Sequence, residues 1–336
     1  MNRILFFFLF ILFISACGSA NDFIDDIEGV NNIDSILIIP PSPQDSTTNN
    51  STDSIVIRND TTIIPKDSTL VKNDSISSDS LCIKERTEIE FSKLFRLNSI
   101  SKNSSQGFAI YGNLLFNCHH TNDVIDVFNL ETQKIVSSIQ LEPETIVHCN
   151  NVNFGSEFYD KEDRFPLLYI QQRGYACKLN VYRIICEGDS ILTAKKVQTI
   201  SFKSCSWCIN AIDAKNSLLY AIYGYNGKNY ISSFRLPSVH EGDVTIHPGS
   251  AYKSYYNIYQ RVGQDTAFDD KYLYIVCGYS GEGELWRIDL ENKVAKVIDL
   301  TKYGLKWEPE GIDIYNGYIM VSFLNAPLYR IKILDN

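Results

Sequence analysis

From residue 83 onward the sequence repeats a group of short apolar strands at a spacing of about 50 residues. Each predicted strand alternates apolar and polar residues and ends at turn-forming residues. No segment has the apolar spacing of an amphipathic helix. The second strands of several groups share a Leu-Tyr pair, as in residues 217–222 and 272–276. A four-strand group that buries its faces only against its neighbours predicts a blade of a β-propeller.

The first strand and the last group complement each other. The group that begins at residue 311 has only three strands, whereas the strand at residues 87–95 stands alone before the first complete group. If that strand pairs with the last group, both irregularities disappear and the ring closes. We therefore predict an all-β fold, a five-bladed β-propeller closed by an N-terminal strand, with six blades as the alternative. A β-sandwich would not explain this complementarity.

Two assignments within the third group depend on a long connection. We expect its outer strand at residues 243–246, where Asp-Val-Thr-Ile has a strand pattern. The tyrosine-rich residues 252–259 are then expected in a loop. Such a loop belongs either to the rim of the channel, where tyrosines suit sugar or peptide surfaces, or to the packing of an interblade connection.

The chain before the repeat has the composition of a spacer. Residues 18–80 are rich in Asp, Asn, Ser and Thr and have no sustained period, so they cannot bury enough apolar surface to fold. We predict a disordered tether over residues 17–82, followed by the propeller domain over residues 83–336. Seven Asp-Ser or Asp-Thr pairs in the tether resemble the acceptor motif of a bacterial O-glycosylation system, which implies a glycosylated stalk. The pairs begin at Asp34, Asp45, Asp53, Asp60, Asp67, Asp74 and Asp79.

The N-terminus reads as an export signal. Asn2 and Arg3 precede an apolar run over residues 4–14, which is too short for a permanent membrane helix, and residues 14–17 are Ile-Ser-Ala-Cys. This pattern resembles bacterial lipoprotein signal peptides, which implies removal of residues 1–16 and acylation of Cys17. We expect an outer-membrane lipoprotein of the cell envelope, on either the periplasmic or the exposed side.

Polar residues stand at the predicted starts of the inner strands, which converge on one channel in a propeller. We expect their side chains to surround the channel mouth and bind a ligand. The alternative is a polar channel that contains water and binds no ligand. Asp213 and Asp265 are expected near the same strand starts. The predicted ligand-binding residues are Gln106, His148, Asn150, Asn210, Gln260, Glu308 and Glu310.

Residues 307–313 (Trp-Glu-Pro-Glu-Gly-Ile-Asp) form the sharpest local motif. They resemble the Pro-Glu-Gly-Ile segment of esterase-like phytases and gluconolactonase-type propellers, which implies acidic residues that help hold a metal or the substrate. A turn set by the proline and glycine is the alternative interpretation. The cofactor is unknown, with calcium as a candidate because it takes six to eight oxygen ligands. Its candidate ligands here are Asn150, Asn210, Asp213, Glu308 and Glu310.

The cysteines and histidines give weaker signals. Cys205 and Cys208 have CxxC spacing without a second metal-binding pair, so they are buried thiols, a local or longer-range disulfide, or a metal or redox site. Cys118 and Cys149 lie in apolar strand patterns. His119 and His120 point to opposite faces of a strand, so we expect them at the surface or in a loop.

The function that follows is binding. The net charge is -9 without a basic cluster, which excludes nucleic acid as a partner. The chain resembles uncharacterised propeller lipoproteins of Gram-negative bacteria, and its candidate ligands are a carbohydrate, a peptide or a protein. A hydrolase of the glycosidase or esterase/lactonase type is the first alternative, because Asp213, Asp265, Glu308 and Glu310 could supply paired carboxylates. A structural scaffold is the second.

Overall fold

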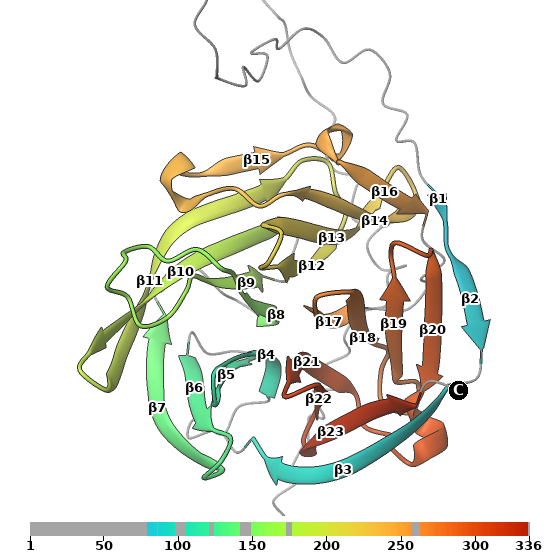
Figure 1. Cartoon of the computed structure of the whole chain (residues 1–336), viewed down its shortest axis with the longest axis horizontal. Helices are drawn as coiled ribbons and strands as arrows, with labels where there is room; N and C mark the ends of the chain where they lie inside the picture. The colour runs from blue at the N-terminus through green and yellow to red at the C-terminus, as the bar shows by residue number, and fades with distance from the viewer. Residues whose placement is uncertain are drawn as a thin grey trace, which may run out of the picture. The chain divides into compact units, whose positions relative to one another are not determined.

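The predicted strands form antiparallel meanders around a common centre (Figure 1). This computed structural model describes residues 79–85, 87–97, 105–120, 124–141, 149–172, 177–256 and 263–334. Within these ranges the fold is all-β and propeller-like, without an α-helix, as the sequence predicted. The described 3-10 helices are too short to cross a membrane. They are η2 (Val239–Glu241), η3 (Pro248–Ser250) and η4 (Leu300–Tyr303).

The first two meanders share one sheet. Their outer strands β7 and β11 pair in parallel, with Gln140 opposite Thr193 and Leu141 opposite Ala194. The first meander consists of β4 (Ser105–Tyr111), β5 (Leu114–His119), β6 (Val124–Asn129) and β7 (Lys134–Leu141). The second consists of β8 (Cys149–Phe154), β9 (Leu168–Gln172), β10 (Lys178–Glu187) and β11 (Ser190–Phe202).

Three further meanders follow in chain order, each in its own sheet. The third consists of β12 (Cys208–Asp213), β13 (Leu218–Tyr225), β14 (Lys228–Arg235) and β16 (Lys253–Tyr256). The fourth consists of β17 (Gly263–Phe268), β18 (Tyr272–Cys277), β19 (Glu284–Asp289) and β20 (Val294–Asp299). The fifth consists of β21 (Pro309–Tyr315), β22 (Tyr318–Phe323) and β23 (Pro327–Leu334), with β3 (Glu88–Arg96) as its outer strand.

The N-terminal strands run along the outside of three meanders in succession (Figure 1). β1 (Asp79–Ser80) pairs with β16, β2 (Cys82–Glu85) pairs with β20, and β3 pairs antiparallel with β23. Leu81 is buried beside these pairings. Strand pairing therefore reaches back to Asp79, into the end of the segment predicted as tether. The predicted signal peptide, Cys17 and residues 18–78 lie outside the described residues.

The outer strand of the third meander differs from the prediction. Residues 244–246 form β15 (Val244–Ile246), which pairs in parallel with β11 of the second meander. The outer strand is instead β16, in the tyrosine-rich stretch that we expected to be a loop. Ser254 and Tyr255 of β16 are buried, so this segment covers the third meander while β15 extends its neighbour.

The inner strands pack closely around the centre. β4 contacts β8 and β21, and β12 contacts β8 and β17. A Cβ added to Gly107 on β4 would lie 2.5 Å from the carbonyl oxygen of Asn150 on β8, so glycine is required for this approach. The centre is therefore tightly packed at this level.

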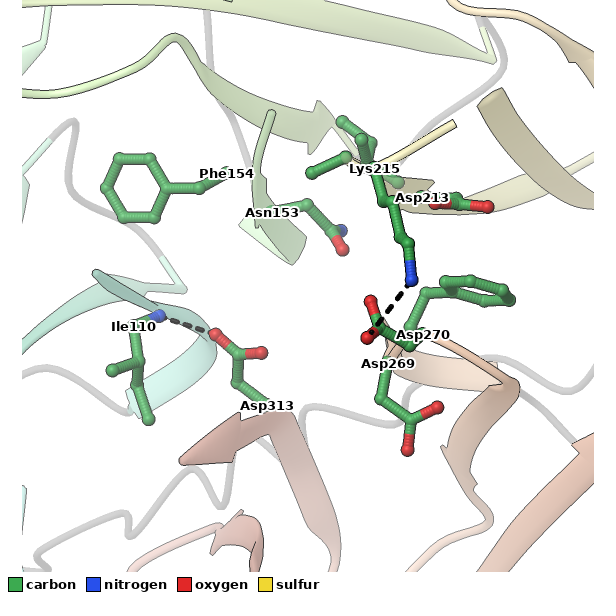
Figure 2. Close-up of a pocket in the computed structure, with 11 residues that line it drawn as sticks. Ile110, Asn153, Phe154, Asp213, Lys215, Asp269, Asp270 and Asp313 are labelled. Carbon is green, nitrogen blue, oxygen red and sulfur yellow. Dashed lines mark hydrogen bonds and ion pairs between the residues drawn. The ribbon is translucent and has the colours of Figure 1, made fainter. Parts of the chain in front are cut away.

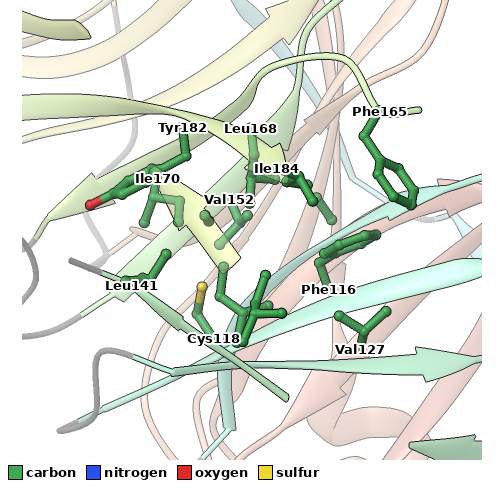
Figure 3. Packing of buried hydrophobic residues seen from close by; sticks show 14 of the residues in the cluster. Phe116, Cys118, Val127, Leu141, Val152, Phe165, Leu168, Ile170, Tyr182 and Ile184 are labelled. Atoms are coloured by element: carbon green, nitrogen blue, oxygen red, sulfur yellow. The ribbon is translucent and has the colours of Figure 1, made fainter. Parts of the chain in front are cut away.

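Apolar clusters fill the spaces between successive meanders. In the cluster of Figure 3, Phe116 and Val127 of the first meander pack against Leu168, Ile170 and Ile184 of the second. Four similar clusters involve the other neighbouring pairs. Each meander thus buries both faces, as the repeat pattern predicted.

Candidate functional site

A buried carboxylate joins the inner strands at the centre of the fold. Asp265 on β17 is fully buried. Its Oδ1 accepts hydrogen bonds from Asn151 Nδ2 at 2.5 Å and from the backbone N–H of Thr266 at 2.8 Å. Its Oδ2 accepts from the backbone N–H groups of Ile312 at 3.0 Å and Phe108 at 3.4 Å. Loss of solvation raises the pKa of Asp265 well above its usual range, despite these donors.

Asn151 extends this network to the remaining inner strand. Its side-chain oxygen accepts from the backbone N–H of Asn210 at 3.0 Å, and its Nδ2 also donates to Thr266 Oγ1 at 3.0 Å. Thr266 Oγ1 donates in turn to the carbonyl oxygen of Asn210 at 2.6 Å. Asp265 and Asn151 therefore connect β4, β8, β12, β17 and β21 through hydrogen bonds, and polar side chains fill the centre.

A cavity of about 170 Å³ lies at the C-terminal ends of the inner strands (Figure 2). Every inner strand contributes to it: Ile110 from β4, Asn153 from β8, Asp213 from β12, Phe268 from β17 and Asp313 from β21. The other lining residues are Phe154, Ile212, Ala214, Lys215, Asp269 and Asp270.

Asp313 is a carboxylate of the cavity lining whose pKa is raised. It is half-buried, and it accepts hydrogen bonds from the backbone N–H groups of Ile110 at 2.5 Å and Ile314 at 2.7 Å. Loss of solvation raises the pKa of Asp313 to about 7, although both backbone donors favour the ionised form. Asp313 therefore changes between its protonated and ionised forms near neutral pH, whereas a carboxyl group in water does so at about pH 4.

Two other lining carboxylates are held by turns. Asp213 accepts from the backbone and the side-chain amide of Asn216, at 3.0 and 2.8 Å. Asp269 accepts from the backbone N–H groups of Lys271 and Tyr272 and from the hydroxyl of Tyr274, at 2.6 to 2.8 Å. These bonds fix both side chains where the inner strands end.

The rim carries an exposed ion pair. Lys215 Nζ lies 3.4 Å from Asp270 Oδ2, and both side chains are largely exposed. An exposed pair of this kind contributes little to stability. Since the lining residues include four carboxylates and a single ammonium, the cavity favours ligands that are cationic or donate hydrogen bonds. Phe154 and Phe268 are the aromatic residues of the lining.

The residues predicted from the sequence lie toward the other ends of the inner strands. Gln106, Asn150 and Glu310 are buried near the starts of β4, β8 and β21. Glu308 precedes β21 and accepts a hydrogen bond from Gln264 Nε2 at 2.8 Å. None of these lines the cavity. His148 and Gln260 lie outside the described residues.

Asn150 and Asn210 both carry buried side-chain oxygens without a hydrogen-bond partner. Asn210 is wholly buried within β12, where its Nδ2 donates to Gln171. It therefore belongs to the packed centre and not to an open channel mouth.

Asp213 ends β12 and was wrongly grouped with the strand starts. Because a strand rises about 3.3 Å per residue, Asp213 cannot share one calcium ion with Glu308 at the opposite end of the inner strands. The described residues contain no group of three or more His, Cys, Asp or Glu side chains that could hold a metal ion.

The sequence reasoning overlooked Asp269, Asp270 and Asp313. A signal was present, since Asp213 ends one inner strand, Asp269 follows another, and Asp313 lies two residues before the end of a third. The predicted site includes the strand starts alone, although a central cavity has two ends.

His119 is buried, which contradicts the expected surface or loop position. Its Nε2 lies 2.9 Å from Asp126 Oδ2, and the Oγ of Ser138 donates to Asp126 Oδ1 at 2.7 Å. These side chains connect β5, β6 and β7 within the first meander. The arrangement joins three strands of that sheet, and none of its residues lines the cavity.

Comparisons with known proteins found similar solved structures but no matching family. Neither a protein-family model nor a curated protein matches this sequence. Among solved structures, Myxococcus xanthus glutaminyl cyclase is similar at 12% identity and a TM-score of 0.47, over 76% of this chain and 100% of that one. The PQQ-bound aldose sugar dehydrogenase of Streptomyces coelicolor is similar at 11% identity and a TM-score of 0.46, over 74% and 99%.

Proposed function

We propose that this chain is a lipid-anchored binding protein. Its domain is a five-bladed β-propeller closed by β3, and its ligand site is the cavity at the C-terminal ends of the inner strands. The observation that supports this site is convergence: each of the strands β4, β8, β12, β17 and β21 places a side chain on one cavity. Concave sites with a few converging polar groups are where small ligands bind.

The lining indicates the chemistry of the ligand. Asp213, Asp269, Asp270 and Asp313 supply acceptors, and Lys215 is the only cation among the lining residues. Phe154 and Phe268 suit the apolar face of a sugar ring or an alkyl chain. At about 170 Å³ the cavity is smaller than the roughly 300–1,000 Å³ of drug-sized sites. We therefore propose a small ligand that presents hydroxyl or ammonium groups, such as a monosaccharide or an amino sugar.

Binding of glucose, glucosamine and putrescine tests this site by isothermal titration calorimetry. Asp313→Asn keeps the shape of the cavity and removes its titrating carboxylate, so the affinity for at least one of these probes should fall by about tenfold or more. Asp189→Asn is the matched control, because Asp189 is an exposed carboxylate outside the cavity. Equal affinities for the wild type and Asp313→Asn, or no binding of any probe, would contradict the proposed site.

The strand starts are tested with the double variant Glu308→Gln and Glu310→Gln. If the ligand binds in the cavity, this variant binds the same probes as tightly as the wild type. If it loses binding while Asp313→Asn keeps it, the site belongs at the strand starts, as the sequence first suggested.

Hydrolysis is the second candidate function, and the protonation of Asp313 favours it. A carboxylic acid with a pKa of about 7 suits a general acid, and the same cavity holds other carboxylates, including Asp269. Release of nitrophenol from nitrophenyl glycosides tests this activity. It should depend on Asp313 and fall as the pH rises through 7. No turnover above the rate of Asp313→Asn would leave binding as the function.

The lipid anchor is tested by changing its attachment residue. We expect Cys17→Ser to move the protein from the membrane fraction to the soluble fraction, because acylation of Cys17 would supply the anchor. A variant that still sediments with membranes after a high-salt wash would refute the lipoprotein proposal.

A further inference from the structure

Four described cysteines stand in two pairs. Burial and the neighbouring Cys118 raise the pKa of the Cys149 thiol, and burial and the neighbouring Cys177 raise that of the Cys208 thiol. Both members of each pair also lie in one apolar cluster, so each pair is a candidate for a disulfide. All four thiols are free and buried.

Both pairs join successive meanders. Cys118 is on β5 and Cys149 is on β8, where both belong to the apolar cluster between the first and second meanders. Cys177 immediately precedes β10 and Cys208 begins β12, and both belong to the cluster between the second and third meanders. A bond in each pair would link three meanders covalently.

The second pair bears on whether Cys208 pairs with Cys205, as their CxxC spacing allows, or with another cysteine. The partner of Cys208 is Cys177, whereas the Sγ of Cys177 donates to the backbone oxygen of Cys205 at 3.3 Å. Burial raises the pKa of the Cys205 thiol to about 12, while the hydrogen bond with Cys208 lowers the pKa of Cys177. Among Cys177, Cys205 and Cys208, the Cys177 thiol therefore ionises most readily and is the best nucleophile, and it shares an apolar cluster with Cys208.

We propose that Cys118–Cys149 and Cys177–Cys208 are disulfide bonds in the exported protein. This inference rests on the proposed export, because disulfides form and persist in oxidising compartments outside the cytoplasm. The oxidant is a protein disulfide or a small-molecule disulfide such as oxidised glutathione.

The exchange balances in two steps. The thiolate of Cys177 attacks one sulfur of the oxidant's disulfide, which forms a mixed disulfide and releases the oxidant's other sulfur as a thiolate. The thiolate of Cys208 then attacks the Sγ of Cys177 and releases the second sulfur of the oxidant. Two thiols of the chain have lost two protons and two electrons, and the oxidant's disulfide has become two thiols. The same steps apply to Cys118 and Cys149.

Peptide mapping tests the pairing in the full-length protein isolated from the cell envelope. Free thiols are alkylated under denaturing conditions before digestion without reductant. The expected result is one peptide pair linked through Cys118 and Cys149 and another linked through Cys177 and Cys208. A Cys205–Cys208 link would overturn the pairing. Alkylation of all four residues would also overturn it if neither link forms in the oxidation experiment below.

Oxidation in vitro separates the pairing from the export. The reduced full-length protein is refolded with oxidised glutathione and mapped in the same way. If both links form only in vitro, the pairing stands and the proposed export to an oxidising compartment fails. If neither link forms in either sample, the pairing itself is wrong.

Thermal unfolding supplies a second readout. Each link encloses roughly 30 residues, so we expect Cys177→Ala to lower the Tm of the oxidised protein by about 10 °C. In excess reductant the variant and the wild type should unfold at nearly the same temperature. Cys186→Ala is the control, because Cys186 is not in either pair and should leave the Tm nearly unchanged under both conditions. An equal effect of Cys177→Ala with and without reductant would contradict the disulfide.

Discussion

The proposed closure of the ring depends on β3, and Ile89 tests it. Ile89 lies opposite Ile333 in the pairing of β3 with β23 and is only 7% exposed. It belongs to an apolar cluster that also contains Leu285 and Ile298 of the fourth meander. Its side chain therefore packs between β3, the outer strand of the fifth meander, and the sheet of the fourth meander. The adjacent Glu90 is exposed and supplies a control on the same strand.

The size of the effect follows from the atoms removed. Ile89→Ala deletes three carbon atoms, which lose about 2.4 kcal/mol of transfer free energy at roughly 0.8 kcal/mol each. The cavity left behind adds to this, so the free energy of unfolding should fall by about 3 kcal/mol. With a urea m-value of about 3 kcal/mol/M for a domain of this size, the midpoint moves down by about 1 M.

Urea denaturation followed by tryptophan fluorescence measures this shift. Glu90→Ala should change the free energy of unfolding by at most about 0.5 kcal/mol. If Ile89→Ala has as small an effect as Glu90→Ala, β3 is not part of the folded core and the ring is not closed by it. A chain that begins at residue 98 extends the test. It should regain stability when a peptide of residues 87–97 is added, because the peptide restores the outer strand.

Three further predictions concern the centre and the cavity. Asp265→Ala removes the acceptor of four buried donors, so urea denaturation should show a loss of about 3 kcal/mol or more, whereas Asp265→Asn, which keeps one oxygen, should lose less. Gly107→Ala should cost about 2 kcal/mol by the same assay, while Gly249→Ala, whose added Cβ meets nothing within 4 Å, should cost far less. Because the pKa of Asp313 is raised to about 7 in the folded state, the folded chain binds its proton more tightly than the unfolded chain, and this contribution to stability is lost as the pH rises from about 4 to 7. Denaturation across that range should therefore show a flatter pH dependence for Asp313→Asn than for the wild type, and an unchanged slope would contradict the raised pKa.

The strand content was predictable because its determinants are local. Alternating apolar residues and the turns between them are short-range features, and the all-β propeller fold that they predicted is confirmed. The outer strand of the third meander was misplaced for the opposite reason. Residues 244–246 and 253–256 both have a strand pattern. They follow β14 in the chain, with η2 before the first segment and η3 between the two. Only the packing of Tyr255 into the third meander distinguishes the two segments.

The position of the cavity was not predictable from the same patterns. Polar residues at both ends of an inner strand look equivalent in a sequence, and the difference comes from the packing between strands. Gly107 and Gly311 let β4, β8 and β21 approach each other near their starts, because a Cβ at either glycine would clash with its neighbours. Toward the other ends of the inner strands, Asp213 and Asp313 line the cavity.

The packed centre also determines how the cavity is coupled to the rest of the fold. Asp265 and Asp313 both lie on inner strands, and each accepts a backbone hydrogen bond from a neighbouring meander, Ile312 for Asp265 and Ile110 for Asp313. The two carboxyl groups also interact electrostatically, since the nearby Asp313 adds to the effect of burial in raising the pKa of Asp265. A ligand that carries an ammonium group into the cavity would stabilise the ionised form of Asp313 and lower its pKa. Binding of such a ligand should therefore release a proton near neutral pH, whereas binding of a neutral sugar should not.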